Sequence, residues 1–151
     1  SQMMWSEQAP ISLRIFSLPA QLPVVRAAVE KTCELLGFDD QTTGQVVLSV
    51  DEALTNIIKH AYKSACDRPI EIELSVLETE ALPALRISLR DYGCWVDPSL
   101  IRSRDLHDIR PGGLGVHIMK NCMDSVDYRQ ADGGGTLLTM TKNLPVQARE
   151  A

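Results

Sequence analysis

The sequence lacks the features that mark several large classes of protein. No apolar run approaches the roughly 20 residues that span a bilayer, and the N-terminal stretch SQMMWSEQAP has no signal-peptide core. Lys and Arg number 15 against 20 Asp and Glu, and the net charge of −5 argues against non-specific nucleic-acid binding. No internal repeat or low-complexity segment occurs. These absences predict a soluble, cytoplasmic protein that contacts neither nucleic acid nor a membrane directly.

Cysteines are few and lie far apart in the sequence, at Cys33, Cys66, Cys94 and Cys122. They form no C-x-x-C pair, and no His stands at a zinc-ligand spacing from two of them. We therefore expect reduced thiols, as in a cytosolic protein, rather than disulfides or a zinc site.

The remaining composition is that of an ordinary globular domain. Hydrophobic residues make up 44% of the 151 residues and charged residues 23%, which is enough for one substantial core. Patterned sequence covers 11–143, so we expect one domain there, with flexible ends over 1–10 and 144–151.

Hydrophobic periodicity predicts an α+β fold. The expected strands cover 11–18, 70–76, 85–89, a start at 126, and 137–140, and the expected helices cover 22–36, 46–62 and 114–124. The strands over 70–89 should form a hairpin, whereas the long loop over 94–113 is typical of a functional or mobile segment. Because strands and helices do not alternate regularly, we expect a two-layer sandwich with the helices on one face of a mixed, mostly antiparallel sheet.

The helix over 46–62 carries polar residues beside its apolar stripe. The stripe consists of Val46, Val50, Ala53, Leu54, Ile57 and Ala61. Glu52, Asn56 and His60 follow one another at intervals of four residues, so their side chains share a neighbouring face. An amide and a carboxylate are costly to bury without a partner or a function. The pattern is compatible with a solvent-exposed edge or with a functional face.

A second signal is Asp91-x-Gly93 at the end of an expected strand. Both residue types favour turns, so the pair could simply end the strand. Alternatively, the carboxylate could accept a hydrogen bond from an exocyclic amine, and the glycine could let a flat ring approach the backbone.

Two glycine-rich segments complete the set of signals. Residues 110–116 (RPGGLGV) lead into an expected helix, where free N–H groups and the helix dipole suit a phosphate group, although a flexible hinge would look the same. The segment is neither a Walker A motif nor a dinucleotide fingerprint. Gly133, Gly134 and Gly135 indicate a hairpin turn, after which Thr136 could place a hydroxyl group in a pocket wall.

The order of these signals resembles the GHKL ATPase superfamily, which includes gyrase, heat-shock chaperone and histidine-kinase ATP-binding domains. The resemblance is closest to the bacterial anti-sigma factor serine/threonine kinases. The matching pieces are DEALTNIIKHAY, LRDYG, RPGGLGVHIMKNCMDSVDY and GGGTLLTMTK. Together they extend from about Ser12 to Lys142, nearly the whole expected domain.

The resemblance implies roles for the polar face of the helix. Asn56 matches the family's Mg²⁺ ligand, and Glu52 matches the general base that takes a proton from a serine or threonine hydroxyl. Asp51 points about 100° away from Glu52 on a helix and is a poorer candidate for the base. His60, one turn beyond Asn56, matches a structural or pocket-edge position.

The resemblance also implies how the nucleotide is held. Asp91 matches the residue that reads the adenine amino group, Gly93 the residue that gives the ring room, and Thr136 the residue that supports adenine through water. The phosphate-cradling positions at the helix start are Gly112, Gly113, Leu114 and Gly115. Arg110 matches a position from which a cation could reach the terminal phosphates.

By resemblance, the protein is an ATP-dependent and Mg²⁺-dependent kinase that holds a sigma factor inactive and phosphorylates an anti-anti-sigma protein of the STAS-domain type. The resemblance further suggests a homodimer. An alternative is a nucleotide-binding regulatory module of the same fold without kinase activity. A third is a domain that binds no nucleotide and whose glycines only form turns.

Overall fold

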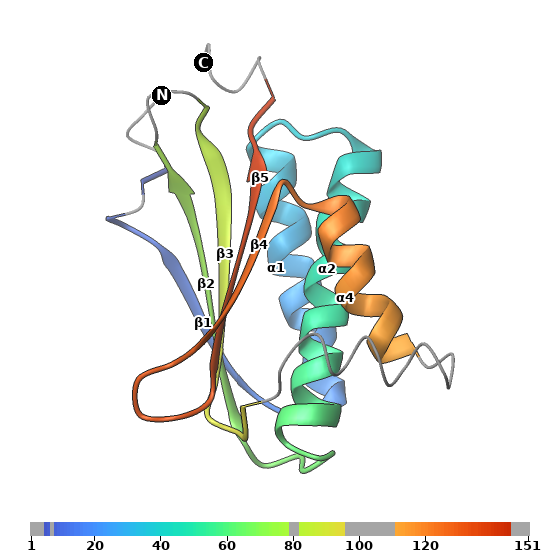
Figure 1. The fold of residues 1–151 in the computed structure, drawn as a ribbon. Helices are drawn as coiled ribbons and strands as arrows, with labels where there is room; N and C mark the ends of the chain where they lie inside the picture. The colour runs from blue at the N-terminus through green and yellow to red at the C-terminus, as the bar shows by residue number, and fades with distance from the viewer. Residues whose placement is uncertain (1–4, 7, 79–81, 96–110, 146–151) are drawn as a thin grey trace.

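Five strands form one sheet, and helices pack against one of its faces (Figure 1). The computed structural model describes residues 5–6, 8–78, 82–95 and 111–145, and only the backbone over 111–116. The strands are β1 (Ile11–Phe16), β2 (Pro69–Leu77), β3 (Ala84–Asp91), β4 (Ser125–Gln130) and β5 (Thr136–Asn143). The helices are η1 (Pro19–Gln21), α1 (Leu22–Leu35), α2 (Asp40–Asn56), η2 (Ile57–Ala61) and α4 (Pro111–Cys122). The expected α+β sandwich is thereby confirmed, and none of the helices in the described ranges is long and apolar enough to cross a membrane.

The sheet order is β1-β2-β3-β5-β4, and all four pairings of neighbouring strands are antiparallel. The predicted hairpin is present, with β2 directly paired to β3. The last strand, β5, inserts between β3 and β4, so that Thr136 lies opposite Asp91 in the register. Two candidate site residues, 45 positions apart in the sequence, therefore become direct cross-strand neighbours.

Local signals in the sequence fix where the first helices begin and end. Gly37 has φ of 87°, the left-handed conformation that commonly terminates a helix, and it follows the end of α1. Asp39 caps α2 because its carboxylate Oδ1 accepts a hydrogen bond from the Thr42 backbone N–H at 2.7 Å. Residues 39–42 thus form the N-terminal cap and first turn of α2.

The predicted apolar stripe of α2 faces the sheet and is buried. Val46, Val50 and Leu54 have no exposed surface, and Ile57 retains only 7%. They pack against the sheet residues that alternate inward, such as Ile70 and Leu89. Each such side chain stabilises the folded state by about 1.5–3 kcal/mol. This burial fixes which face of α2 is left for polar groups.

Three helix boundaries differ from those predicted by more than two residues. Helix α2 begins at Asp40, not at 46. The single helix expected over 46–62 is α2 followed by a π-helical turn, η2, in which one extra residue per turn displaces the backbone. Helix α4 begins at Pro111, not at 114, so Gly112 and Gly113 lie in its first turn. Proline suits this position because its fixed φ is helical and its missing N–H would be unpaired there.

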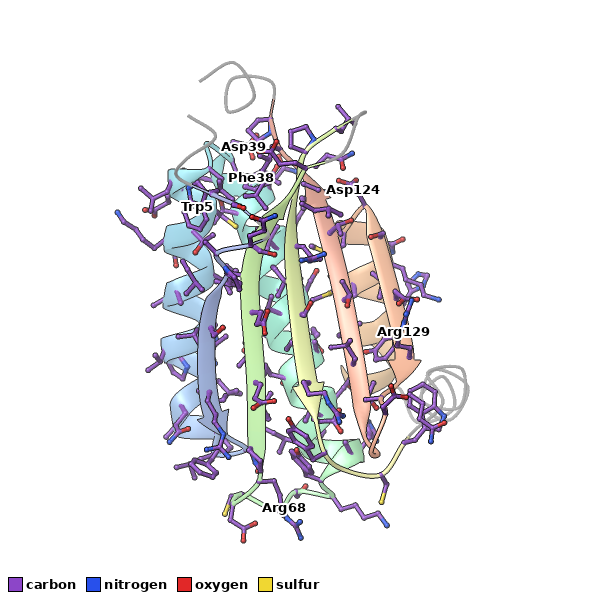
Figure 2. All side chains as sticks on the ribbon, turned by 90° about the vertical axis from the view of Figure 1, so that its left-hand side faces the viewer. Trp5, Phe38, Asp39, Arg68, Asp124 and Arg129 are labelled. Atoms are coloured by element: carbon purple, nitrogen blue, oxygen red, sulfur yellow. The ribbon has the colours of Figure 1, made fainter. Side chains whose placement is uncertain are left out.

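The two ends of the sheet differ in what they hold. Figure 2 shows Trp5, Phe38, Asp39 and Asp124 at one end and Arg68 at the other. The first and last described segments of the chain belong to the former end, where Trp5 packs against the core and the Leu144 N–H donates to the Pro83 carbonyl at 2.9 Å. The opposite end holds Asp91, Thr136 and η2.

Candidate functional site

A small cavity lies between the C-terminal end of α2, with η2, and the end of the sheet that holds Asp91. Its lining residues are Ala53, Asn56, Ile57, His60, Ala61, Asp91, Cys94, Tyr128, Thr136 and Leu138. The cavity volume is about 30 Å³, enough for a water molecule but far below the roughly 300–1,000 Å³ typical of small-molecule pockets. A nucleobase therefore requires these walls to move apart.

Asn56 is the most unusual group in this wall. The residue is only 5% exposed, and neither its Oδ1 nor its Nδ2 has a hydrogen-bond partner in the described part of the chain. A buried amide without partners destabilises the folded state by about 1–3 kcal/mol. Such a group is expected where a ligand supplies the missing partner, and an amide oxygen is a suitable ligand for a hard cation such as Mg²⁺.

Tyr128 closes the cavity from β4. Its hydroxyl group stands close to the Asn56 amide without completing a hydrogen bond. Burial raises the pKa of Tyr128; the Asn56 side chain opposes this shift, and the Asp91 carboxylate adds to it. The phenol is therefore neutral at physiological pH and can donate a hydrogen bond into the cavity.

Asp91 offers a buried hydrogen-bond acceptor at the end of β3. The residue is 2% exposed, and Thr136 opposite it is 7% exposed. Burial raises the pKa of Asp91, whereas the backbone N–H groups of Gly93 and Thr136 and the charge of Arg90 lower it. The Gly93 N–H donates to the Asp91 Oδ1 at 3.0 Å. A carboxylate beside a threonine hydroxyl suits a ligand that presents an amino group.

The π-helical turn η2 holds the segment that follows Asp91. The Cys94 N–H donates to the Ala61 carbonyl at 3.2 Å, and the Tyr92 N–H donates to the Tyr62 hydroxyl at 2.7 Å. A Cβ atom on Gly93 would lie 2.4 Å from the Ala61 carbonyl oxygen. The glycine is thus required for close packing of η2 against the strand end, whether or not it also gives a ring room.

Glu52 and Asp51 have separate surroundings on α2. Arg26 of α1 donates through Nε to Asp51 Oδ1 at 2.8 Å, which turns this carboxylate toward α1. Glu52 is half-buried, and its Oε2 has no hydrogen-bond partner among the described residues. Burial raises the pKa of Glu52, and Asp51 raises it further, while Lys59 opposes the shift. A raised pKa suits a group that must accept a proton near neutral pH.

The glycines of α4 are brought to the same end of the molecule. α4 packs on α2 and runs antiparallel to it, so the start of α4 lies near the end of α2 (Figure 1). The backbone of Gly112, Gly113, Leu114 and Gly115 forms the first turns of this helix. Free N–H groups at a helix start bind phosphate groups. Arg110 lies outside the described residues.

The structure gathers part of the predicted site into one cavity wall. Asn56, His60, Asp91 and Thr136 line it together. Glu52 is one turn from Asn56 but is not among the lining residues. Sequence reasoning missed Tyr128 and Cys94. The only sequence signal for Tyr128 was its position two residues after Val126, on the same inward face of β4.

The chain is similar to several known proteins. Residues 15–142 match the family described as the histidine kinase-like ATPase domain. The chain is 33% identical over 104 residues to the serine/threonine-protein kinase BtrW of Bordetella bronchiseptica, which covers 66% of this chain and 70% of that protein. It is 26% identical over 143 residues to the serine-protein kinase RsbW of Bacillus subtilis, which covers 89% of this chain and 85% of that protein.

A solved structure has a similar fold. The crystal structure of the RsbU and RsbW domains of a Mycobacterium tuberculosis protein covers 90% of this chain, with a TM-score of 0.62 and 20% sequence identity. This chain spans 32% of that longer chain. At this identity the match supports the fold alone.

Proposed function

The chain belongs to the histidine kinase-like ATPase family, and on that basis we propose that it is an ATP-dependent serine/threonine protein kinase of the anti-sigma factor type. In this proposal it holds a sigma factor inactive and phosphorylates an anti-anti-sigma protein of the STAS-domain type on serine or threonine. The relatives named as serine or serine/threonine kinases support the transferase part. The two protein partners rest on the resemblance of the motifs.

One observation carries the nucleotide part of the proposal, namely the buried, unpartnered amide of Asn56 in one cavity with Asp91 and Thr136. An amide oxygen with no protein partner fits the role of a magnesium ligand, and Mg²⁺ needs only one or two such ligands from the protein. A bound Mg²⁺ would neutralise charge on the triphosphate. Asp91 would accept a hydrogen bond from the adenine amino group, and Thr136 would support the ring.

In this proposal α4 binds the phosphate groups of the nucleotide, and α2 supplies the group that accepts the proton of the substrate hydroxyl. The backbone N–H groups of Gly112, Gly113 and Gly115 would hold the phosphate groups at the start of α4, with Arg110 as the added cation. Glu52 would accept the proton of the substrate hydroxyl group, for which its raised pKa is suited. Positioning and electrostatics supply most of the rate enhancement in phosphoryl transfer, so the alignment of these groups matters more than the strength of any one base.

A second candidate function is a nucleotide-binding regulatory module without transferase activity. The observation that favours it is the position of Glu52, which does not line the cavity wall that holds Asn56. A module of this kind would bind ATP through the same residues but would not need a base.

A phosphotransfer assay separates the two functions. The protein is incubated with Mg²⁺, γ-labelled ATP and a candidate STAS-domain protein, and label on the STAS-domain protein is measured for wild type, Glu52→Gln and Asp51→Asn. The kinase proposal expects transfer by wild type and Asp51→Asn and little by Glu52→Gln, with ATP affinity equal in all three. Tight ATP binding without any transfer by wild type would favour the regulatory module.

Sigma-factor binding needs a separate experiment. Size-exclusion chromatography of the protein with a candidate sigma factor, with and without Mg-ATP, would detect a complex directly. We expect a stable complex that the unphosphorylated STAS-domain protein dissociates. A sigma factor that never co-elutes at micromolar concentrations would contradict the sequestration role.

A further inference from the structure

We propose that Arg90 is a positioning residue that holds the end of β3 and the β4–β5 turn together, and thereby sets the adenine selectivity of the site. This inference rests on the proposed function, because it assigns a role to a residue that does not line the cavity. Arg90 acts through Asp91 and Thr136, which do.

The guanidinium group of Arg90 bridges two segments that are far apart in the sequence. Its Nη1 donates to the backbone carbonyls of Asp91 and Gly134, both at 2.6 Å, and its Nη2 donates to the Asp132 carbonyl at 3.2 Å. One side chain thus satisfies a carbonyl at the strand end and two in the turn that leads directly into Thr136. Hydrogen bonds to a charged donor contribute more than neutral ones.

The turn needs an external clamp because glycine dominates it. Gly133, Gly134 and Gly135 all have positive φ, at 84°, 100° and 78°, and glycine has the largest backbone freedom to lose on folding. Gly135 is packed so closely that a Cβ atom there would lie 2.1 Å from the Asp91 carbonyl oxygen and 2.9 Å from Arg90 Nη1. The position of Thr136 relative to Asp91 therefore depends on this contact.

The guanidinium group is itself held in place on the open face of the sheet. Its Cζ lies 4.3 Å from the centroid of the Tyr92 ring, a cation–π distance. The Tyr92 hydroxyl in turn donates to a Glu71 carboxylate oxygen. The Tyr92 ring thus holds the Arg90 guanidinium group on the side of the sheet opposite to the cavity.

Arg90 also acts on the charge of the adenine-reading carboxylate. Burial raises the pKa of Asp91, and the Arg90 charge is one of the influences that lower it. Loss of this charge would favour the protonated carboxyl group, whose O–H donates a hydrogen bond and no longer only accepts one. Arg90 therefore fixes the position of the acceptor and contributes, less than the backbone N–H groups of Gly93 and Thr136, to keeping it charged.

Lysine cannot replace arginine here, because an ammonium group lacks the rigid fork of donors that reaches three fixed carbonyls. The test therefore uses Arg90→Ala and Arg90→Lys, with Arg86→Ala as the matched control. Arg86 lies four residues earlier on the same face of β3, next to the other end of β5. Dissociation constants for Mg-ATP and Mg-GTP are measured by calorimetry for each variant, and melting temperatures are recorded without nucleotide.

We expect Arg90→Ala to weaken ATP binding about tenfold, which corresponds to the loss of about one charge-assisted hydrogen bond. The ratio of ATP to GTP affinity should fall by a similar factor in Arg90→Ala. In Arg90→Lys it should fall by a smaller factor. Arg86→Ala should remain within about twofold of wild type in its ATP affinity and in its ratio of ATP to GTP affinity. A merely structural role would lower the melting temperature but leave the selectivity ratio of the folded protein unchanged.

The outcomes separate the two proposals. If wild type binds ATP and the selectivity of both Arg90 variants equals that of wild type, the positioning role is wrong and the proposed function stands. If wild type binds no adenine nucleotide, the proposed function fails and this inference fails with it. If Arg90→Ala does not fold, the selectivity of Arg90→Lys decides.

Discussion

Replacing Asn56 by leucine should make the protein more stable and unable to bind Mg-ATP. Leucine has the same branched heavy-atom skeleton as asparagine and is somewhat larger, so the substitution removes the amide without opening a cavity. The amide is 5% exposed and unpartnered in the described part of the chain. A natural protein keeps such a group only where it serves another purpose, and we propose that this purpose is the metal.

The magnitude follows from the unmet hydrogen bonds. An unsatisfied buried polar group destabilises the folded state by about 1–3 kcal/mol, and its replacement by an apolar group of the same shape recovers that amount. We therefore expect the free energy of unfolding to rise by about 1–3 kcal/mol. For a domain of this size, each kcal/mol raises Tm by about 2–4 °C.

The assay is urea denaturation followed by circular dichroism, since a shifted midpoint at constant slope reports stability alone. Mg-ATP is added in a second series, where wild type should gain stability from the ligand and Asn56→Leu should gain none. Ser17→Ala is the control, because this buried hydroxyl is satisfied: it donates to the Ala65 carbonyl at 2.6 Å and accepts from the Arg68 N–H at 3.1 Å. That variant should be destabilised.

A lower unfolding free energy in Asn56→Leu, at an unchanged slope, would refute the reasoning. It would mean that the amide makes stabilising hydrogen bonds in the free protein, for example through a water molecule to the Tyr128 hydroxyl. Normal Mg-ATP binding by the variant would separately contradict the metal assignment.

Three further changes test other parts of the site. Asp91→Asn should reduce the preference for ATP over GTP, because the amide adds a donor where adenine needs an acceptor; competition binding measures this ratio, and an unchanged ratio would reject the assignment. Gly93→Ala should lower the unfolding free energy by about 1–3 kcal/mol through overpacking against the Ala61 carbonyl, and denaturation at wild-type urea concentrations would show that η2 yields instead. The pKa of Glu52 is raised on folding, so its folded form binds a proton more tightly and stability falls as pH rises from the ordinary carboxyl value of about 4. Glu52→Gln removes this dependence, and its stability advantage over wild type should grow from pH 4 to 7 in paired denaturation curves; an advantage that shrinks would contradict the direction of the shift.

Periodicity sufficed to predict the layers of this fold and the polar wall of α2. The stripe of Val46, Val50 and Leu54 identifies the buried face, and strict alternation identifies the strands, because both patterns depend on local geometry. The neighbours of Asn56 across the cavity could not be derived in this way. Asp91 and Thr136 meet only because β5 inserts between β3 and β4, a long-range pairing that no local pattern encodes.

The π-helical turn and the Arg90 clamp escaped prediction for related reasons. η2 depends on contacts between Ala61 and Gly93, 32 positions apart in the printed sequence, and residues 57–61 carry no distinctive composition. Arg90 alternates with inward-facing residues of β3, so its position indicates only an exposed side chain. Its three acceptors are backbone carbonyls, and a sequence says nothing about where carbonyls point.

The arrangement of the two ends of the sheet has a consequence for how this domain can be combined with others. Its first and last described segments leave the fold at the end that holds Trp5 and Leu144, whereas the cavity opens at the end that holds Asp91 and η2. A polypeptide fused before Ile11 or after Asn143 would thus extend from the side away from the cavity. Gene fusion could attach sensor or output modules on that side of the domain while access to the cavity stays open.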